Sequence, residues 1–405
     1  MSRKKRKKIK ATSKTIYRLS ILIAIIGLFF LGSLVFNSLN RKDAGASSSN
    51  LSSNIKSNTG KLATKDAEPE DNKKNSPNNK NIKNTPSTEA YTEVLLNSVG
   101  DCTLGNDDKF SYQGSLPHTL KKNNNDYSYI FKNVNSIFSS DDITIANFEG
   151  TLTTYSQKAE KQFTFKAPPE YAKILTLGSI EGVNISNNHT RDYLEKGFQD
   201  TKLALKAENI NYFGEGSTWI KDVKGTKFGF LGYKGYYSSK ELQAKIKKDI
   251  QNLKDQNRIV IINFHWGEEG SYHPNSTQKS LAHFAIDNGA DLIIGHHPHV
   301  LQGIEKYKNK IICYSLGNFA FGGNKNPSDK DTMIVQVKFK FKNNSLDSYD
   351  LKVIPCTISS VNYTNDYKPT VAQGNKKTAI LDKLNKISPN LGFKLDGNFH
   401  NIPIE

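Results

Sequence analysis

Three of the chain's nine histidines stand within four positions in the segment Gly295–Gln302, GHHPHVLQ. The segment follows the short apolar run Leu292–Ile294, which reads as a buried strand. Neutral imidazole binds Zn, Mn and Fe ions, and the end of a strand holds a short ligand rigidly. A metal site is therefore one explanation for the cluster, and a polar loop rich in histidine is the other.

Polar side chains also follow the other predicted strands. Taken singly, each has a structural explanation: a turn acid, a helix cap or a packed histidine. Together they supply carboxylate, amide and imidazole ligands at the strand ends where α/β sheets bind their ligands, a mixture that suits Mn, Fe, Zn or Mg. These candidate residues are Asp101, Asn147, Glu149, Asn187, Asn188, His189, Asp192, His265, Glu268, Glu269, His296, His297, His299 and Asn318.

Short β-branched and aromatic runs alternate with longer amphipathic ones from Tyr91 onward, which predicts an α/β fold with a largely buried sheet. The expected strands are Glu93–Val99, Ile143–Phe148, Val183–Ser186, Lys227–Gly232, Ile259–Phe264, Leu292–Gly295 and Ile311–Ser315. The expected helices are Tyr129–Phe138, Pro169–Leu177, Tyr193–Glu208, Lys240–Leu253 and Ser276–Asn288. Beyond them, Met333–Lys342 and Leu346–Ile354 flank Asn343-Asn344-Ser345 and predict a hairpin at a sheet edge or in a second sheet.

The first 18 residues carry nine Lys or Arg and no acid, and the apolar stretch Leu19–Phe36 follows them. This pattern predicts a cytoplasmic segment 1–18 and an uncleaved transmembrane signal anchor 19–39, with the rest of the chain outside the cell membrane. A cleaved signal peptide ending at Ala44-Gly45-Ala46 is the alternative, but Arg41, Lys42 and Asp43 precede that site.

Residues 40–88 are rich in Ser, Asn, Lys and Thr and predict a disordered linker, so that 89–405 is the folded domain, strand-rich from about residue 333. The basic start and the linker hold most of the net charge of +17, so nothing in the folded part suggests nucleic-acid binding. Cys102, Cys313 and Cys356 lack metal-site spacing; they allow at most one disulfide, and we expect structural roles.

The motifs become specific when taken in order: GD, NFEGTLT, FTFKAPPE, SNNHTRDY, HWGEE, GHHPHVLQ and YSLGNFAF. This series, within residues 91–335, resembles the CapA family of poly-γ-glutamate capsule synthesis proteins, whose extracellular domain is similar to the calcineurin-like metallophosphoesterases. The resemblance implies a four-layer α/β/β/α sandwich with two divalent metal ions.

The same resemblance implies roles for the candidate residues. The metal ligands would be Asp101, Glu149, Asn188, His265, His297 and His299. His189 and Asp192 would be catalytic, with His189 as the general acid, and Asn147, Asn187, Glu268, His296 and Asn318 would contact substrate or support the ligands. Two positions depart from the phosphoesterase pattern: Thr103 stands where a histidine is usual, and Glu149 replaces a bridging aspartate.

The expected function is therefore that of a membrane-anchored protein for synthesis, export or attachment of an anionic capsule polymer, poly-γ-glutamate, with metal-dependent hydrolase chemistry. Its partners would be the membrane, the other synthase components and the polymer. Two alternatives stay open on the sequence alone: a non-catalytic subunit that binds polymer or synthase, and a wall-directed metallophosphoesterase.

Overall fold

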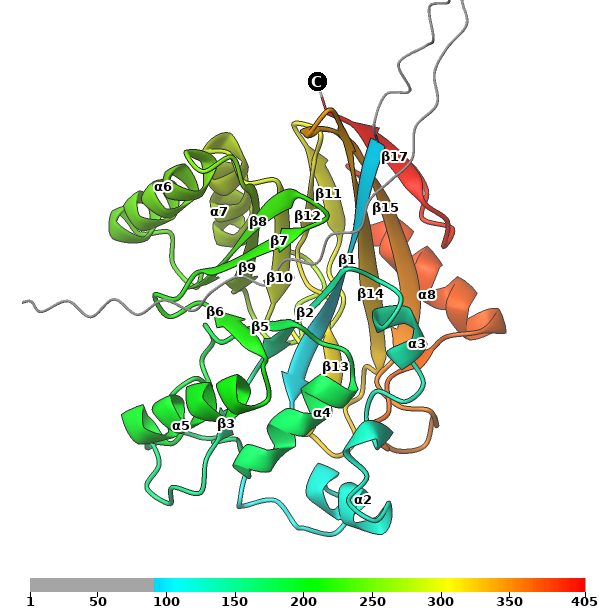
Figure 1. Ribbon diagram of the computed structural model, residues 1–405. Coiled ribbons are helices and arrows are strands. Elements are labelled where there is room, and N and C mark those ends of the chain that lie inside the picture. Colours follow the sequence, from blue (N-terminus) through cyan, green and yellow to red (C-terminus); the bar gives the residue numbers. More distant parts are fainter. Residues whose placement is uncertain (1–90, 405) are drawn as a thin grey trace, which may run out of the picture. The chain divides into compact units, whose positions relative to one another are not determined.

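The computed structural model describes residues 91–404, which belong to one compact unit (Figure 1). The expected basic segment, signal anchor and linker lie outside the described residues. Between residues 91 and 404, none of the helices combines the length and the apolar character needed to cross a bilayer.

The larger sheet has nine strands in the described chain, and its main path runs β16-β15-β14-β1-β2-β5-β6. Two more strands pair with it, β13 alongside β1 and β17 alongside β15. Strands β1, β2, β5, β6 and β13 are parallel, so their carboxyl ends meet at one edge, whereas the long hairpin β14-β15 is antiparallel. The bounds are β1 Tyr91–Thr103, β2 Ile143–Phe148, β5 Gly182–Asn184, β6 Asn211–Phe213, β13 Asn318–Phe321, β14 Asp331–Lys342, β15 Ser345–Thr357, β16 Thr370–Val371 and β17 His400–Pro403.

The second sheet has the order β11-β12-β10-β9-β8-β7, with β8, β9, β10 and β12 parallel. Its bounds are β7 Trp219–Val223, β8 Thr226–Lys234, β9 Ile259–His265, β10 Leu292–His296, β11 Ile304–Tyr307 and β12 Lys310–Cys313. A two-stranded ladder joins β3 (Thr151–Leu152) to β4 (Lys166–Ala167).

Three apolar clusters in the described chain lie between the layers of sheets and helices. One cluster joins the facing sides of the two sheets, where Leu96 and Ile145 meet Phe230 and Ile294. The outer side of the larger sheet packs on α3 (Asn135–Phe138), α4 (Ala172–Leu177) and α5 (Leu194–Ala207), and the outer side of the second sheet packs on α6 (Lys240–Lys254) and α7 (Ser276–Asp287). The described chain is thus an α/β sandwich with helices on both outer faces (Figure 1).

The remaining helices are short or peripheral. They are α2 (Leu116–Lys122), the 3₁₀ turns η1 (Tyr127–Tyr129) and η2 (Pro169–Tyr171), and α8 (Gly374–Ile387). Helix α8 buries Ile380 and Leu384 in the cluster between the sheets, which closes that core beside β15.

The predicted strands and most predicted helices are present within a few residues of the expected ends. The helix expected over Tyr129–Phe138 is wrong, because the backbone turns until Asn135 and only Asn135–Phe138 is helical. Val134, with φ −127°, lies outside the helical region, although the buried side chains of Ile130, Val134 and Phe138 have helical spacing. The predicted C-terminal hairpin is confirmed: β14 pairs with β1, and β15 continues the larger sheet.

Candidate metal centre

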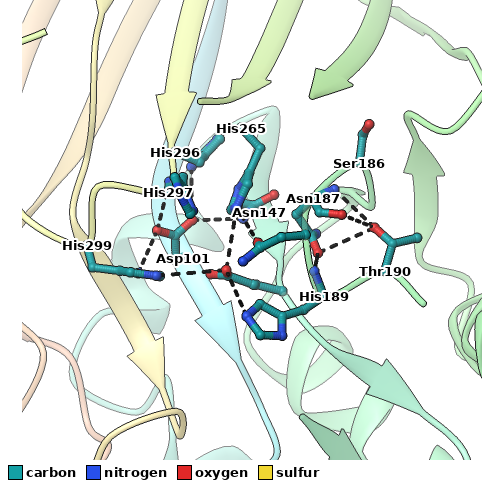
Figure 2. Close-up of polar contacts among 12 residues, drawn as sticks. Asp101, Asn147, Ser186, Asn187, His189, Thr190, His265, His296, His297 and His299 are labelled. Atoms are coloured by element: carbon teal, nitrogen blue, oxygen red, sulfur yellow. Dashed lines mark hydrogen bonds and ion pairs between the residues drawn. The ribbon is translucent and has the colours of Figure 1, made fainter. Parts of the chain in front are cut away.

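The two sheets bring their polar strand ends together. Across the parallel strands β1, β2 and β5, Asp101 is the register partner of Asn147, and Asn147 is the partner of Asn184. In the second sheet, His265 at the end of β9 is the partner of His296 at the end of β10. Figure 2 shows Asp101 and Asn147 from the larger sheet and His265 and His296 from the second sheet converging on one centre.

Asp101 is fully buried and is held from several sides. Asn147 Nδ2 donates to its Oδ1 over 2.8 Å, the backbone N–H of His297 donates to its Oδ2 over 3.2 Å, and His299 Nδ1 lies 3.3 Å from Oδ2. Burial disfavours the charged carboxylate, but the hydrogen bond and charge of His299 outweigh it and lower the pKa of Asp101. The site therefore favours an ionised Asp101.

Glu149 follows β2 directly and is the most informative residue of the centre. Its side chain is fully buried, yet neither carboxylate oxygen has a hydrogen-bond partner among the described residues. Its Oε1 lies 3.5 Å from His265 Nε2 and 3.9 Å from both His189 Nε2 and His299 Nε2. Burial raises the pKa of Glu149 well above its usual range. A buried carboxylate of this kind needs a positive partner.

The donor atoms around Glu149 fit a divalent cation. Among the described residues, three sets each bring their ligand atoms within 4.8 Å of one another. They are Glu149, His265 and His297; Asp101, Glu149 and His299; and Glu269, His297 and His299. Carboxylate oxygens with imidazole nitrogens suit Mn, Fe or Zn, and a bound cation would satisfy the oxygens of Glu149 that have no partner among the described residues. The identity and number of the metals do not follow from these atoms.

The histidines of the opening segment have different environments. His297 and His299 have positive φ values of 95° and 58°, so the backbone of the loop after β10 is in an uncommon, left-handed conformation at both residues. Burial lowers the pKa of His297 to about 4. The Nδ1 atom of His297 has no hydrogen-bond partner in the described chain. Burial opposes a charge on His299 as well, but the Glu149 and Asp101 carboxylates raise its pKa to about 10. Protonated His299 thus supplies the positive charge that a bound cation would replace.

His265 and His296 stand side by side at the sheet end but face different partners. His265 Nε2 lies 2.8 Å from Asn188 Oδ1, so these two predicted ligands are in contact, and burial lowers the pKa of His265 well below its usual value. His296 Nε2 lies 3.0 Å from Asn263 Nδ2 inside the second sheet, and its Nδ1 lies 3.6 Å from Asp101 Oδ1. His296 Nδ1 thus lies near Asp101 without a hydrogen bond to any described residue, and burial lowers the pKa of His296 to about 4.

The two predicted catalytic residues form a buried pair beside the centre. His189 Nδ1 lies 2.6 Å from Asp192 Oδ2, which leaves Nε2 facing Glu149. Asp192 also accepts from Lys161 Nζ over 2.7 Å and from the backbone N–H of Phe165 over 2.6 Å. The Phe165 ring packs on the imidazole at 4.3 Å between centroids. Burial lowers the pKa of His189, and Asp192 opposes that effect. This arrangement can orient a proton donor.

Of the other predicted contacts, Asn187 and Asn318 position loops or ligands, whereas Glu268 is not among the residues of the centre. Asn187 donates to the Phe148 carbonyl over 2.8 Å and accepts from the His189 N–H over 3.0 Å, so it fixes the loop after β5. Asn318 Oδ1 lies 2.8 Å from His299 Nδ1. Glu268 is exposed, and it is the next residue, Glu269, whose carboxylate lies with His297 and His299.

Three further residues at the centre are absent from the predictions made from the sequence. Tyr236 packs edge-on against His297 at 5.0 Å between ring centroids, and its buried hydroxyl has no hydrogen-bond partner in the described residues. Lys161 lies in the loop between β3 and β4, and Asn184 donates to Asn147 Oδ1 over 2.9 Å. Only Asn184 could have been found, because it stands at a strand end like the others. At Thr103, where the phosphoesterase pattern has a histidine, the buried hydroxyl is also unpartnered.

A cavity of about 790 Å³ opens onto this centre and is lined by His189, Glu269, His299 and Asn318 together with Phe165 and Phe321. Its volume is that of a small-molecule site, and it gives a substrate access to His189. All three cysteines are buried and unpaired, as expected for structural cysteines.

Comparison with known proteins gives one consistent result. Residues 96–323 match the family model described as bacterial capsule synthesis protein PGA_cap. The chain is 33% identical over 258 residues to capsule biosynthesis protein CapA of Bacillus anthracis, covering 57% of this chain and 61% of that protein. It is 31% identical over 262 residues to PGA biosynthesis protein CapA of Bacillus subtilis strain 168, covering 58% and 66%.

A more distant relative is a probable polyglutamine synthesis accessory protein, MT0602, of Mycobacterium tuberculosis. The identity is 24% over 209 residues, covering 44% of this chain and 55% of the relative. The matches therefore span less than two thirds of each of these three relatives. Because the family model covers more than half of the chain and every residue of the candidate centre, this protein belongs to the bacterial capsule synthesis protein family PGA_cap, to which its CapA homologues also point.

Proposed function

We propose that the protein is a membrane-anchored, outward-facing hydrolase that acts on an anionic capsule polymer, poly-γ-glutamate, at the centre around Glu149. The observation that carries the proposal is the fully buried Glu149 carboxylate without a hydrogen-bond partner, surrounded by imidazoles from both sheets. A structural role alone does not account for such a group, because buried oxygens without hydrogen-bond partners are destabilising.

The proposal includes two divalent cations, which Asp101, Glu149, Asn188, His265, His297 and His299 would hold, with Glu269 beside them. When bound, such cations supply Lewis acidity that activates water and neutralises charge developing on the substrate. The same chemistry applies to a phosphoester and to an amide. Metallophosphoesterases, whose type of sandwich is proposed here, use it on phosphoesters.

The chain's own residues perform the proton transfer. Asp192 fixes His189 through Nδ1, so that Nε2 faces both Glu149 and the cavity. From there Nε2 can hold a proton and release it to a leaving group. Lys161 and the Phe165 N–H hold Asp192, and the Phe165 ring limits the movement of the imidazole and excludes water from one side.

The biological setting is proposed from the relatives and from the sequence. Relatives named for capsule and PGA biosynthesis, and one named a synthesis accessory protein, favour a role beside a polymer synthase. The basic start and apolar stretch of the chain favour anchoring in the cell membrane with the folded part outside. We propose that its partners are the other synthase components.

The test uses the purified full chain with Mn²⁺ or Zn²⁺, poly-γ-glutamate, and a phosphodiester dye substrate. We expect polymer shortening by wild type, loss of activity in Asn188→Ala, and a decrease of about 10²-fold in His189→Gln. His283→Gln is the matched control, because His283 lies on α7 and stacks on Tyr307, away from the centre. Cleavage only of the phosphodiester would favour a wall-directed phosphoesterase instead.

One observation favours a second function, a polymer-binding subunit without catalysis. Thr103 provides no imidazole where the phosphoesterase pattern has one, which weakens the ligand set on the Asp101 side. Capsule production that survives His189→Gln and Asn188→Ala, without measurable hydrolysis, would favour this alternative.

A further inference from the structure

A second cavity of about 800 Å³ adjoins the cavity over the candidate metal centre. Ser328 and Asp329 line both cavities, so the two lie next to each other at the segment that precedes β14. The second cavity extends from Tyr272 to β16 and α8. Each cavity alone has the volume of a small-molecule site, whereas the pair is larger than such a ligand needs.

Three lysines along this double cavity have no carboxylate within 4.0 Å in the described part of the chain. Lys109 and Lys325 line the first cavity and donate to the backbone carbonyls of Gln162, at 2.9 Å, and Gln113, at 2.6 Å. Lys330 lines the second cavity and donates to the carbonyl of Asn362 at 3.3 Å. These carbonyls orient the ammonium groups without neutralising them, so their charge is available to a ligand.

The other charges of the second cavity are already balanced. Lys383 Nζ lies 2.8 Å from both Asp329 Oδ2 and Asp331 Oδ2, Lys376 contacts Asp331, and the Tyr272 hydroxyl donates to Asp329 over 2.9 Å. This network joins α8 to the segment between the two cavities and holds that segment in place. Lys330 is therefore the cation in excess.

The remaining lining of the second cavity is neutral and polar, and includes Ser359, Ser360, Asn362 and Gln373. Such side chains bond amide groups, whereas the lysines bond carboxylates. We propose that the double cavity binds one extended polyamide with carboxylate side groups, with several units over Lys330 and the next ones over the metal centre. This inference rests on the proposed function for the polymer class, but it concerns binding rather than cleavage.

The experiment measures binding of fluorescein-labelled poly-γ-glutamate to the full chain by anisotropy, in chelator, so that hydrolysis does not enter. Lys330→Gln should weaken binding about two- to fivefold, and the double variant Lys325→Gln/Lys330→Gln about four- to 25-fold, since each partly exposed charge pair contributes modestly. Asn362→Trp, which narrows the second cavity without a charge change, should also weaken binding. Lys248→Gln on the exposed face of α6 is the control and should bind like wild type.

Three results would overturn the inference: no binding by wild type, equal binding by all four variants, or tighter binding of an inorganic polyphosphate of matched length. Polymer binding that depends on Lys330, in a protein that cleaves nothing, would support the double cavity while rejecting the hydrolase proposal. Cleavage of polymer at wild-type rate and affinity by the double variant would retain the hydrolase and reject the second cavity.

Discussion

Replacement of Glu149 by methionine, an apolar side chain of similar shape, is the most informative change to the fold itself. Leaving a buried acceptor unsatisfied costs about 1–3 kcal/mol, and Glu149 has two such oxygens. Where Glu149 is ionised, the variant also loses the attraction to protonated His299, whose Nε2 lies 3.9 Å from Glu149 Oε1, so the net gain should be smaller. We expect metal-free Glu149→Met to be about 1–2 kcal/mol more stable than metal-free wild type.

Metal should reverse this order. A cation at 100 times its Kd stabilises the protein that binds it by about 2.7 kcal/mol, and only wild type keeps the Glu149 ligand. Thermal unfolding of both proteins in chelator and in excess Mn²⁺ or Zn²⁺ measures the reversal, at about 1–2 °C for each kcal/mol in a folded part of this length. Glu268→Met, at an exposed carboxylate beside the centre, is the control and should respond to metal like wild type.

The pH dependence provides an internal check. The pKa of Glu149 is raised in the fold, so the folded protein favours the protonated carboxyl, and metal-free wild type should lose stability as pH rises above the usual glutamate value of about 4.3. Glu149→Met should lack this loss. An unchanged order of stabilities with and without metal, or a wild type that no divalent cation stabilises, would refute the reasoning.

Three other changes test separate parts of the account. Asp192→Asn should reduce hydrolysis about 10²-fold with metal content unchanged, because it removes the carboxylate that orients His189; a proportional loss of metal, measured by elemental analysis, would contradict that role. Tyr236→Phe removes a buried hydroxyl without a partner in the described chain and should leave the free energy of unfolding unchanged or raise it by about 1 kcal/mol, whereas a clear decrease in chemical denaturation would reveal a missed hydrogen bond. Asp141→Asn should stabilise the protein at pH 8 and not at pH 4, because burial raises the pKa of Asp141 to about 7, so ionisation costs stability as pH rises through that value; equal effects at both pH values would count against it.

The parts of the centre that the sequence predicts are those fixed by strand ends. Asp101, Asn147 and His265 each end a buried apolar run, and parallel pairing brings such ends to one edge. Tyr236 and Glu269 lie in loops, where no periodic pattern indicates the direction of a side chain. That is why the sequence indicated Glu268 and Glu269 together at this strand end, but a role was expected only for Glu268.

The fold shows the same division between pattern and tertiary context. The alternating apolar residues of β14 and β15 predicted the C-terminal hairpin, but not that β14 would pair along most of β1. Strand β13, with only four residues, is too short to carry a pattern, although its pairing with β1 places Asn318 beside Asp101. The false helix around Val134 arose because buried loop residues can repeat the spacing of a helix.

Elemental analysis of the purified full chain measures whether the centre around Glu149 holds metal. It compares wild type with the double variant His297→Ala/His299→Ala and the control His283→Gln. We predict about two equivalents of Mn, Fe or Zn in wild type and in the control, and a loss of most of the metal in the double variant, because His297 and His299 each belong to two of the three ligand sets. No bound metal in wild type after loading with excess ion, or equal metal in all three proteins, would contradict a metal centre at Glu149.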